Sequence, residues 1–381
     1  MHSLYESPPR GSVRHLREFL SIQDEWQELH RDSAWRTPFL SFAFVRLWYD
    51  CFADPDQVRI CRVKEGKSTI GFLPMVLSRR NRLRTLESLT NDHCFHSEPL
   101  VRRGCEDRFP ALLLQAIQED RNGWDVFRHR FSYSFSRFPG LFGEDLLSRS
   151  GLSWRRRRQP TYSIRMKRPF DEYYHGDLTS GFRKLLRKYG NRLARRGEVI
   201  CRHYQGEEAV NAWPDFLRIE DSGWKGSAGT SINRIAPNLQ RYYQGLIELL
   251  ADQESLHLHF LDLDGERVAG QLCYTEEDIF HAFKTGYDER FGEYSPGNLL
   301  LMHVINHVTT SRPQARRIHM FPWAYGHKQR YVNEKASCFE TWLYSKTTRG
   351  RTAHLFSGAK RAVKRVVRKS GDAEEIRVNV G

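Results

Sequence analysis

Residues 256–307 read LHLHFLDLDGERVAGQLCYTEEDIFHAFKTGYDERFGEYSPGNLLLMHVINH, and the succession of patterns in this stretch decides the fold. Apolar side chains alternate with other residues over 256–263 and again over 268–274, with the period of two that is typical of half-buried β-strands. Asp264-Gly265 lies between the two runs and is a hairpin turn signal. The stretch is therefore predicted to begin with an antiparallel β-hairpin.

A third strand, a turn and a helix are predicted to follow. The alternation over 279–283 predicts the strand, and the chain is expected to bend at Gly286. A Ser-Pro-Gly turn at 295–297 then precedes a helix predicted over 299–308. Unpaired N–H groups and the helix dipole favour an anion at such a turn, which is therefore predicted to hold a diphosphate. The same turn is also an ordinary junction between a loop and a helix.

Other motifs flank this stretch in a fixed order. Upstream, IEDSGWKG at 219–226 is followed by Gly-Thr at 229–230, and downstream FPWAYGHK occupies 321–328. Together with Gly-Tyr-Asp at 286–288 and the Ser-Pro-Gly turn, this order resembles the GNAT acyltransferase superfamily. More narrowly, it is similar to the CelD-like acetyltransferases of bacterial exopolysaccharide and cellulose gene clusters, which are relatives of the Fem-type aminoacyl transferases. The resemblance covers roughly residues 160–345 and depends on the order of the motifs.

The resemblance implies an α/β (α+β) fold of tandem GNAT-like units, each a mixed, largely antiparallel sheet flanked by helices. It implies direct transfer of an acetyl or other acyl group from acetyl-CoA or another acyl-CoA to an amine acceptor, without a metal. The acceptor expected from the resemblance is an amino sugar in polysaccharide or cell-envelope biosynthesis.

The same resemblance implies roles for individual residues. These are catalysis by Lys328, Tyr325, Glu220 and Asp288, coenzyme contacts from Thr285, Gly286, Ser295, Gly297 and Asn298, and substrate contacts from Trp224 and Lys225. The carboxylates would accept the proton of the ammonium acceptor, whereas Lys328 and Tyr325 would stabilise the oxyanion or the leaving thiolate. Trp224 is alternatively a core aromatic residue. The Ser-Pro-Gly turn stands where an Arg/Gln-x-x-Gly-x-Gly/Ala run is common in GNAT proteins, so the acyl donor stays open.

A second hairpin in the first half of the chain has the same spacing. The alternation over 57–77 is interrupted by a Glu-Gly-Lys turn. Gly265 follows Gly66 by 199 residues, and Gly270 follows Gly71 by the same interval. This spacing favours a duplicated α/β unit, as the Fem-type relatives have, although two common hairpins can also coincide.

The duplication predicts three segments. A first GNAT-like unit is expected over 1–160, the acetyltransferase unit over 161–348, and a basic tail over 349–381. The first unit has no Ser-Pro-Gly turn after its third strand, so it is expected to shape the acceptor cleft and not to bind coenzyme. In the tail, bases and apolar residues repeat at helical spacing without an acid between Arg349 and Lys369. This predicts a basic amphipathic helix that contacts an anionic membrane surface or packs on the second unit.

Composition limits the compartment and the class of ligand. The 381 residues are 39% hydrophobic, enough for two domain cores, and the net charge of +14 implies attraction to anions. The seven cysteines are scattered and never form a Cys-x-x-Cys pair, which indicates a reducing compartment. Residues 1–11 contain no apolar run typical of a signal peptide, and no run of about 20 apolar residues occurs anywhere. We expect a cytoplasmic protein.

The clearest predicted helix lies between the two copies. Apolar residues from Phe182 to Leu193 form one stripe, and seven bases without an acid stand between Arg183 and Arg196. Such a face is either simply solvated or contacts an anionic acceptor or carrier. Four more consecutive bases, Arg155–Arg158, form a similar site or a solvated linker.

Several other chemistries are disfavoured. Gly66-Lys67-Ser68 resembles the end of a P-loop, but Cys61 stands where the earlier glycine is required. No Gly-x-Ser-x-Gly elbow of an α/β-hydrolase is present. The histidine pairs 257/259 and 303/307 have spacings that suit a metal, yet no cysteine pair or His-Glu-x-x-His motif accompanies them. We therefore interpret them as core or surface residues.

Two alternatives to acyl-CoA chemistry stay open. One is Fem-type aminoacyl transfer from a charged tRNA, with the basic helix over 183–196 contacting the tRNA backbone. The other is a non-catalytic anion-binding protein that keeps the fold. The sequence does not identify the acceptor, the oligomeric state, or a choice between N- and O-acylation.

Overall fold

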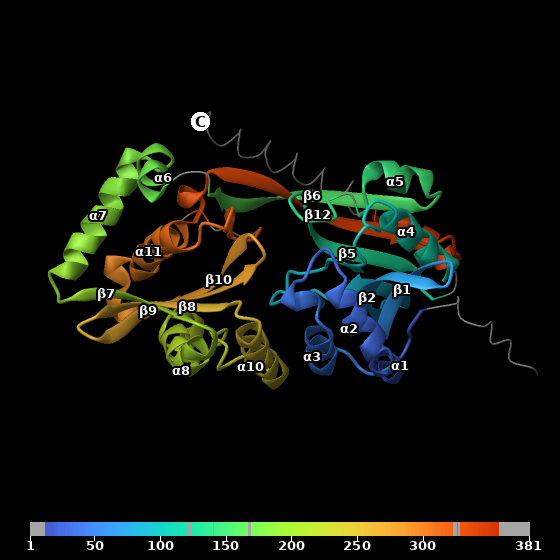
Figure 1. The fold of residues 1–381 in the computed structure, drawn as a ribbon, viewed down its shortest axis with the longest axis horizontal. Coiled ribbons are helices and arrows are strands. Elements are labelled where there is room, and N and C mark those ends of the chain that lie inside the picture. The colour runs from blue at the N-terminus through green and yellow to red at the C-terminus, as the bar shows by residue number, and fades with distance from the viewer. Residues whose placement is uncertain are drawn as a thin grey trace, which may run out of the picture. The chain divides into compact units, whose positions relative to one another are not determined.

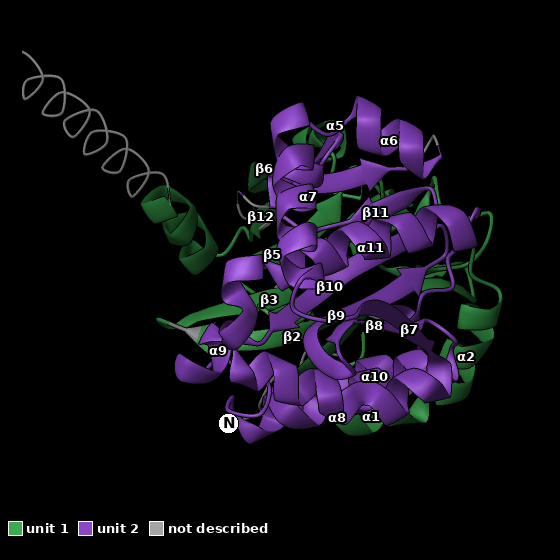
Figure 2. Ribbon diagram, turned by 90° about the vertical axis from the view of Figure 1, so that its left-hand side faces the viewer, with its two compact units in different colours: residues 1–34, 55–158, 339–381 green, residues 35–54, 159–338 purple. Residues whose placement is uncertain are grey.

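The computed structural model describes residues 12–120, 123–139, 141–166, 169–322, 326 and 328–357. The chain divides into two compact units, one made of residues 1–34, 55–158 and 339–381 and the other of residues 35–54 and 159–338 (Figure 2). We call them unit 1 and unit 2. The predicted basic tail lies largely outside the described residues, which end with a helical stretch over 348–357. Within the described ranges, no helix has the length and apolar character needed to cross a bilayer.

Unit 1 is a mixed sheet with helices packed on it. Its helices include α1 (Leu16–Ser21), α2 (Gln23–Arg31), α4 (Phe109–Glu119) and α5 (Glu144–Arg149). Its strands are β1 (Val58–Glu65), β2 (Ser68–Arg80), β3 (Leu83–Ser88), β4 (Leu100–Val101), β5 (Val126–Tyr133) and parts of β6 (Ser153–Arg165) and β12 (Glu334–Tyr344). They are ordered β1-β2-β3-β5-β12-β6, with β4 paired to β2. Buried residues of α4, α5 and the sheet form its core.

Unit 2 carries a longer series of helices. They are η1 (Pro38–Leu40), α3 (Phe42–Phe52), α6 (Phe170–Gly176), α7 (Ser180–Ala194), α8 (Gly206–Ser222), α9 (Trp224–Ser227), α10 (Pro237–Asp252), η2 (Glu289–Tyr294), α11 (Pro296–Ser311) and η3 (Lys328–Tyr331). Its own strands are β7 (Val199–Gln205), β8 (Leu256–Leu263), β9 (Glu266–Glu276), β10 (Ile279–Tyr287) and β11 (Arg317–His319). From the remaining parts of β12 and β6, the order continues β11-β10-β9-β8-β7.

The sheet of unit 2 is covered on both faces. Helices α6, α7 and α11 lie on one face and α8 and α10 on the other (Figure 1). Every residue of β8 is buried, as expected for a strand between two helical layers. The α11 side is filled by a continuous core in which Leu300, Val304 and Val308 of α11 meet the sheet.

The two units repeat one strand pattern. In unit 1, β1, β2 and β3 are antiparallel neighbours and β5 is parallel to β3. In unit 2, β8, β9 and β10 are antiparallel neighbours and β11 is parallel to β10. This confirms the predicted fold class of two mixed, largely antiparallel sheets flanked by helices.

The repeated glycines have a physical explanation. Gly66 and Gly265 both adopt positive φ, +59° and +82°, in the hairpin turns, where a side chain would be strained. At Gly71, a Cβ would lie 2.6 Å from the Leu100 carbonyl oxygen and against the Phe109 ring. At Gly270, a Cβ would lie 3.0 Å from the Phe216 ring. In each copy, the second glycine leaves room for an aromatic side chain from a packed helix.

Two local expectations were wrong. The third strand does not bend at Gly286, because β10 continues to Tyr287 with the Gly286↔Gly270 pair inside its ladder. The four arginines at 155–158 are not a linker but part of strand β6. Aromatic rings of β12 accommodate these charges in a strand, with Arg156 3.7 Å from the centre of the Phe339 ring and Arg155 4.3 Å from that of Trp342.

Candidate functional site

Strand β10 has one edge that is only partly paired. Its partner β11 is parallel to it at Ile279, Phe280 and His281 and is not paired with it beyond that point among the described residues. On the other edge, β9 pairs with β10 as far as Tyr287, with a β-bulge between Ala282 and Lys284. The last part of β10 therefore keeps an edge that the sheet does not fill, and a bulge adjoins it.

The N-terminus of α11 lies beside this part of β10. A Cβ at Gly297 would lie 3.5 Å from the side chains of both Thr285 and Tyr287. Ser295 caps α11 in the left-handed conformation, with φ 52° and ψ 51°, and Pro296 occupies the first turn. The Ser-Pro-Gly turn thus brings a helix N-terminus to the open edge of β10.

Fewer amides are free at this turn than the sequence suggested. The N–H groups of Asn298 and Leu299 both donate to the Ser295 carbonyl, at 3.0 and 3.2 Å. Pro296 has no N–H, so the Gly297 amide is the donor at this turn that has no partner among the described residues. The Asn298 side chain is also engaged, because its Nδ2 donates to Ser295 Oγ at 2.7 Å and its Oδ1 accepts from Tyr331 at 3.3 Å.

On the α8 side of β10, the buried carboxylate of Glu220 forms ion pairs with two lysines. Glu220 is 1% exposed, and its Oε1 accepts from Lys225 Nζ at 2.9 Å and from Lys284 Nζ at 3.3 Å. Its Oε2 accepts from the Ile232 amide at 2.9 Å. Burial alone would raise the pKa of Glu220, but the charges of Lys284 and Lys225 and these hydrogen bonds hold it below its usual value. Glu220 is therefore ionised and engaged, which makes it a poor proton acceptor.

Lys225 connects this cluster to the backbone of β10. Its Nζ also donates to the Thr285 carbonyl at 2.9 Å. The Thr285 hydroxyl donates to Gln271 Oε1 on β9 at 2.5 Å. The structure thus brings Thr285 and Lys225 together, and it adds Lys284 and Gln271, which the sequence did not single out.

Glycines let the segment carrying Glu220 and Lys225 lie against β10. A Cβ at Gly286 would be 2.8 Å from the Glu220 Cα, and one at Gly223 would be 2.7 Å from the Tyr287 carbonyl oxygen. A Cβ at Gly226 would overlap the Asp221 carbonyl. The structure thus gives Gly286 a packing role, since any side chain there would move α8 away from the strand.

Lys328 begins η3 close to the same cluster. Burial and the neighbouring charge of Lys225 lower its pKa to about 8. The buried Cys273 thiol lies near it on β9, and burial raises the pKa of that thiol despite the lysine charge. Tyr331, at the other end of η3, donates to the Asn298 carbonyl at 3.0 Å and so ties η3 to the N-terminus of α11. An amine with a pKa near 8 can exchange a proton at neutral pH.

Three other predicted residues have different surroundings. Asp288 caps η2 by accepting from the Arg290 amide at 3.0 Å, and the Arg290 side chain holds its pKa below the usual range. This fits a structural cap better than a base. Trp224 is 57% exposed, so it is not the core aromatic considered as the alternative. Tyr325 lies outside the described residues.

The histidine pairs come together with a fifth histidine that the sequence did not single out. His203 of β7 stacks on His307 of α11 with ring centres 3.8 Å apart and forms a hydrogen bond with His259 of β8. His257 receives a hydrogen bond from Arg312 at 3.3 Å. Burial, together with the nearby His307 and His303, lowers the pKa of His203. Among the described residues, no group of His, Cys, Asp or Glu is arranged to hold a metal ion.

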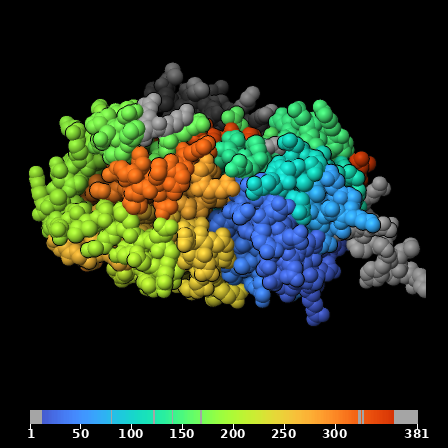
Figure 3. Space-filling model, in the orientation of Figure 1, coloured from blue at the N-terminus to red at the C-terminus, as the bar shows by residue number. Residues whose placement is uncertain are grey.

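Helix α7, which carries many basic residues, packs beside α11. Gly190 of α7 packs near Leu299 of α11, and the surfaces of the two helices adjoin (Figure 3). Arg192 is paired with Glu293 of η2. The exposed bases of α7 and of the two residues after it that have no ion pair to any described residue are Lys184, Arg187, Lys188, Arg195 and Arg196. They give the surface beside the turn a positive potential.

Comparison with known proteins supports one class of domain. Residues 180–329 match the family model of the acetyltransferase (GNAT) domain. This range contains α7 to α11, the Glu220 cluster and Lys328. It supports acyl transfer in general terms. No curated protein matches the chain.

Solved structures share the fold over most of the chain. A conserved protein of unknown function from Bacteroides thetaiotaomicron VPI-5482 is 12% identical, with a TM-score of 0.53, 85% of this chain covered and 97% of that chain. FemX is 9% identical, with a TM-score of 0.53 and coverage of 85% and 96%. The C-terminal domain (DUF2156) of a putative lysylphosphatidylglycerol synthetase from Agrobacterium fabrum is 11% identical, with a TM-score of 0.51 and coverage of 88% and 94%. At these identities the likeness concerns the fold.

Proposed function

We propose that unit 2 transfers an acetyl or other acyl group from an acyl-CoA thioester to an amine, and that the acetyltransferase unit predicted over 161–348 is its part up to residue 338. The observation that carries this proposal is the N-terminus of α11 beside the unfilled edge of β10, where a Cβ at Gly297 would lie 3.5 Å from the side chains of Thr285 and Tyr287. The diphosphate of the donor would lie at the Gly297 amide and the helix N-terminus, where the free N–H group and the positive end of the helix dipole both favour an anion. The GNAT match over 180–329 supports this assignment.

The unfilled edge of β10 suits the acyl chain. A backbone edge without a partner strand offers N–H and C=O groups to a ligand of extended shape, as strands do in β-augmentation. The acyl arm of the donor would run along residues 282–287, where the bulge redirects the backbone. Lys225 then has a positioning role, because its ammonium donates hydrogen bonds both to the Thr285 carbonyl and to the Glu220 carboxylate.

Lys328 is the candidate for the proton-transfer step. The amine nitrogen attacks the thioester carbonyl carbon, a C–N bond forms and the C–S bond breaks, and the sulfur leaves with the electron pair. With a pKa of about 8, Lys328 can donate a proton to this sulfur at neutral pH and regain one, through water, from the attacking nitrogen as it becomes the amide. Its positive charge also stabilises negative charge as it develops. Asp288 is not given a role in this step, because it is bound to Arg290.

The acceptor proposed here is an amino sugar or a similar glycan amine. The exposed indole of Trp224 begins α9, one residue before Lys225. Flat aromatic faces next to a reactive centre bind the apolar face of a sugar ring, which gives Trp224 a substrate-binding role. The matching experiment is a turnover assay with glucosamine and acetyl-CoA, compared with glucose, which lacks the amine. Acetylation of both sugars at equal rates would contradict the amine specificity.

The alternative is aminoacyl transfer from a charged tRNA. The five exposed bases at residues 184–196 favour it, because α7 packs against α11 and these bases have no ion pair within the described part of the chain. Phosphate contacts of this kind would make binding strongly dependent on salt. A filter-binding assay with tRNA at increasing salt separates the two donors, because acetyl-CoA would occupy the turn without requiring Lys188 or Arg195. The third possibility, an anion-binding protein without catalysis, predicts no turnover with either donor.

The decisive test of the proposal is calorimetric titration of acetyl-CoA into the full chain. Stoichiometric binding that competes with free coenzyme A supports it. Absence of binding to the purified, folded protein would refute it.

A further inference from the structure

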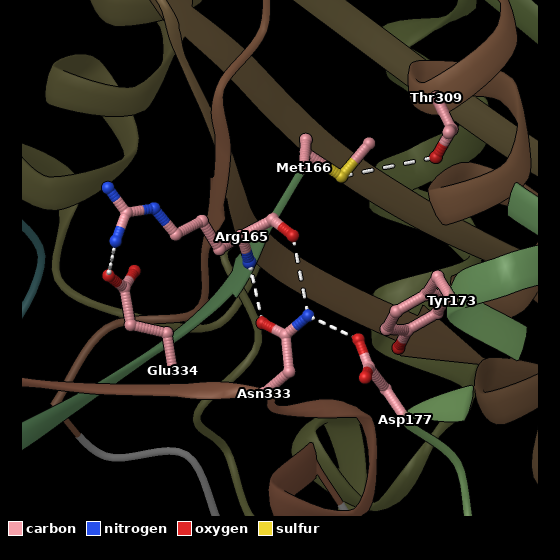
Figure 4. A pocket seen from close by; sticks show the side chains of 7 residues that line it. All are labelled: Arg165, Met166, Tyr173, Asp177, Thr309, Asn333 and Glu334. Atoms are coloured by element: carbon pink, nitrogen blue, oxygen red, sulfur yellow. Dashed lines mark hydrogen bonds and ion pairs between the residues drawn. The ribbon is translucent and has the colours of Figure 1, made fainter. Parts of the chain in front are cut away.

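A separate pocket of about 280 Å³ lies at the other end of α11, within unit 2. Its described lining residues are Arg165, Met166, Tyr173, Asp177, Thr309, Asn333 and Glu334 (Figure 4). They come from the end of β6, from α6 and its C-cap, from the last turn of α11, and from the start of β12. None of these residues belongs to the site described above.

Asn333, Arg165 and Tyr173, which line this pocket, contact neighbouring protein groups. Asn333 Nδ2 donates to Asp177 Oδ2 at 2.6 Å and to the Arg165 carbonyl at 3.3 Å, while its Oδ1 accepts from the Arg165 amide at 2.7 Å. The Arg165 guanidinium points to Glu334, at 3.5 Å (Figure 4). The Tyr173 hydroxyl points out of the pocket and donates to the Tyr331 carbonyl at 2.7 Å.

What remains available in the pocket accepts hydrogen bonds. Asp177 Oδ1 has no partner among the described residues, and the Thr309 hydroxyl, whose proton goes to the Ile305 carbonyl at 2.7 Å, keeps its lone pairs. Thr309 is in the last turn of α11, where the helix dipole favours positive charge. The Met166 thioether and the Tyr173 ring supply an apolar wall.

We propose that this pocket is a binding site for a small organic ammonium ion with an apolar body. The ammonium would donate to Asp177 Oδ1 and Thr309 Oγ1, and the body would lie against Met166 and Tyr173. The carboxylates of Asp177 and Glu334 disfavour an anion here, and an ammonium gains an ion pair with Asp177 that a neutral molecule of the same shape lacks. The proposal does not depend on the proposed acyl transfer.

The pocket is also connected to the turn at the N-terminus of α11. The Tyr173 hydroxyl donates to the Tyr331 carbonyl, the Tyr331 hydroxyl donates to the Asn298 carbonyl at 3.0 Å, and Asn298 Nδ2 donates to Ser295 Oγ. A ligand that fixes Tyr173 would order this chain before the acyl donor binds. Ordering in advance lowers the entropic cost of the second binding step, so the ammonium ligand would tighten donor binding. This second part rests on the proposed function.

The first test uses a pair of probes of the same shape. Phenethylamine carries an ammonium, and 2-phenylethanol replaces it by a hydroxyl. Calorimetric titration into the full chain is expected to show one phenethylamine site and at least about fivefold weaker binding of the alcohol, as one ion pair in a partly open pocket provides. Equal affinity for the two probes would overturn the proposal without any variant.

Variants locate the site. Asp177→Asn keeps an acceptor for Asn333 and removes the charge, so phenethylamine should bind it no better than the alcohol does. Glu172→Gln, an exposed carboxylate of α6 that does not line the pocket, is the control and should bind as wild type. Undiminished binding to a folded Asp177→Asn protein would overturn the assignment.

The coupling is tested by titrating acetyl-CoA with and without saturating phenethylamine. We expect tighter acetyl-CoA binding in the presence of the amine for wild type, and no change for Tyr331→Phe, which still binds the amine. Wild-type acetyl-CoA affinity that does not respond to the amine would refute the coupling. Failure of acetyl-CoA to bind in every sample would instead refute the proposed function and leave the probe comparison standing.

Discussion

The backbone of Glu220 passes so close to Gly286 that a Cβ at position 286 would lie 2.8 Å from the Glu220 Cα. This approach seats α8 directly on β10. It also brings the Glu220 carboxylate to Lys284, two residues before Gly286 on the same strand, with Oε1 3.3 Å from Lys284 Nζ. A glycine in the strand thus determines where the buried carboxylate lies.

Gly286→Ala is expected to destabilise the protein by about 1–3 kcal/mol, the usual cost of an added methyl group in a closely packed place. Here the neighbour that must move is backbone, and it cannot rotate away. Urea unfolding measures the change. Gly181→Ala in α7 is the matched control, since a Cβ there meets nothing within 4 Å, and it should be neutral or slightly stabilising. Equal stability of the two variants would contradict the close approach.

Glu220→Gln is expected to cost about 3 kcal/mol, because it leaves two neighbouring lysines without their counter-charge. Since the pKa of Glu220 is lowered in the folded state, its stabilising effect is present above the unfolded pKa. The effect is lost as the pH falls through the folded value. The difference in unfolding free energy between wild type and variant should therefore shrink in acid. Adding Lys284→Met to the variant should restore part of the stability, and a further loss would contradict the ion-pair explanation.

Turnover should depend on the protonation of Lys328. If Lys328 donates a proton to the leaving sulfur, kcat should fall above about pH 8, the pKa of this lysine. Lys328→Ala should lower kcat about 100-fold and leave acetyl-CoA affinity nearly unchanged. Lys328→Arg stays protonated and should shift or abolish the alkaline limb of the pH profile. An alkaline limb that is identical in both proteins would assign it to another group.

Gly297→Glu is expected to abolish acetyl-CoA binding, because it places a negative charge where the diphosphate would lie. Gly297→Ala is the control. A Cβ at this position makes only ordinary contacts of 3.5 Å with Thr285 and Tyr287, so alanine should fold and bind with little change. Calorimetry on both variants decides the matter, and equal affinity would move the donor away from α11.

Acid should destabilise unit 2 through its histidine cluster. Burial lowers the pKa of His203 to about 4 and that of His257 to about 3. These histidines bind protons at a lower pH in the folded state than in the unfolded state. Stability should therefore be lost as the pH falls from about 6.5, the unfolded pKa, toward 4. His307→Phe keeps the ring that stacks on His203 and removes one titrating group, so it should flatten this dependence. His175→Gln, on the exposed end of α6, should not.

Strand patterns were predicted well because they depend on near neighbours in the chain. The hairpins around Gly66 and Gly265 follow from alternation and a turn residue, and the shared spacing of Gly71 and Gly270 reflects an aromatic side chain packed on each. The bend expected at Gly286 was wrong because the reason for that glycine is α8, more than 60 residues earlier in the chain. Sequence periodicity carries no information about such a contact.

The candidate site was predicted only in part for the same reason. Glu220, Lys225 and Thr285 were each named as candidates and lie together in the structure, whereas Lys284 was missed. Its signal was present, since a lysine within an apolar strand requires a buried partner. Tyr331 was missed because its hydroxyl acts on Asn298 through space. Fewer backbone amides are free at the turn than predicted, because two of them already donate to the Ser295 carbonyl.

Strands β6 and β12 each contribute to both units, and this has a consequence for synthesis on the ribosome. Within unit 1, the segment of β12 after residue 338 lies between β5 and β6 in the sheet order. The ribosome translates β5 and β6 before this segment of β12. The backbone N–H and C=O groups on their facing edges therefore have no partner strand until residues 159–338 have been synthesised. The N-terminal unit is consequently the last to be completed, and a nascent chain halted before Tyr344 would present two open strand edges to chaperones or to other chains.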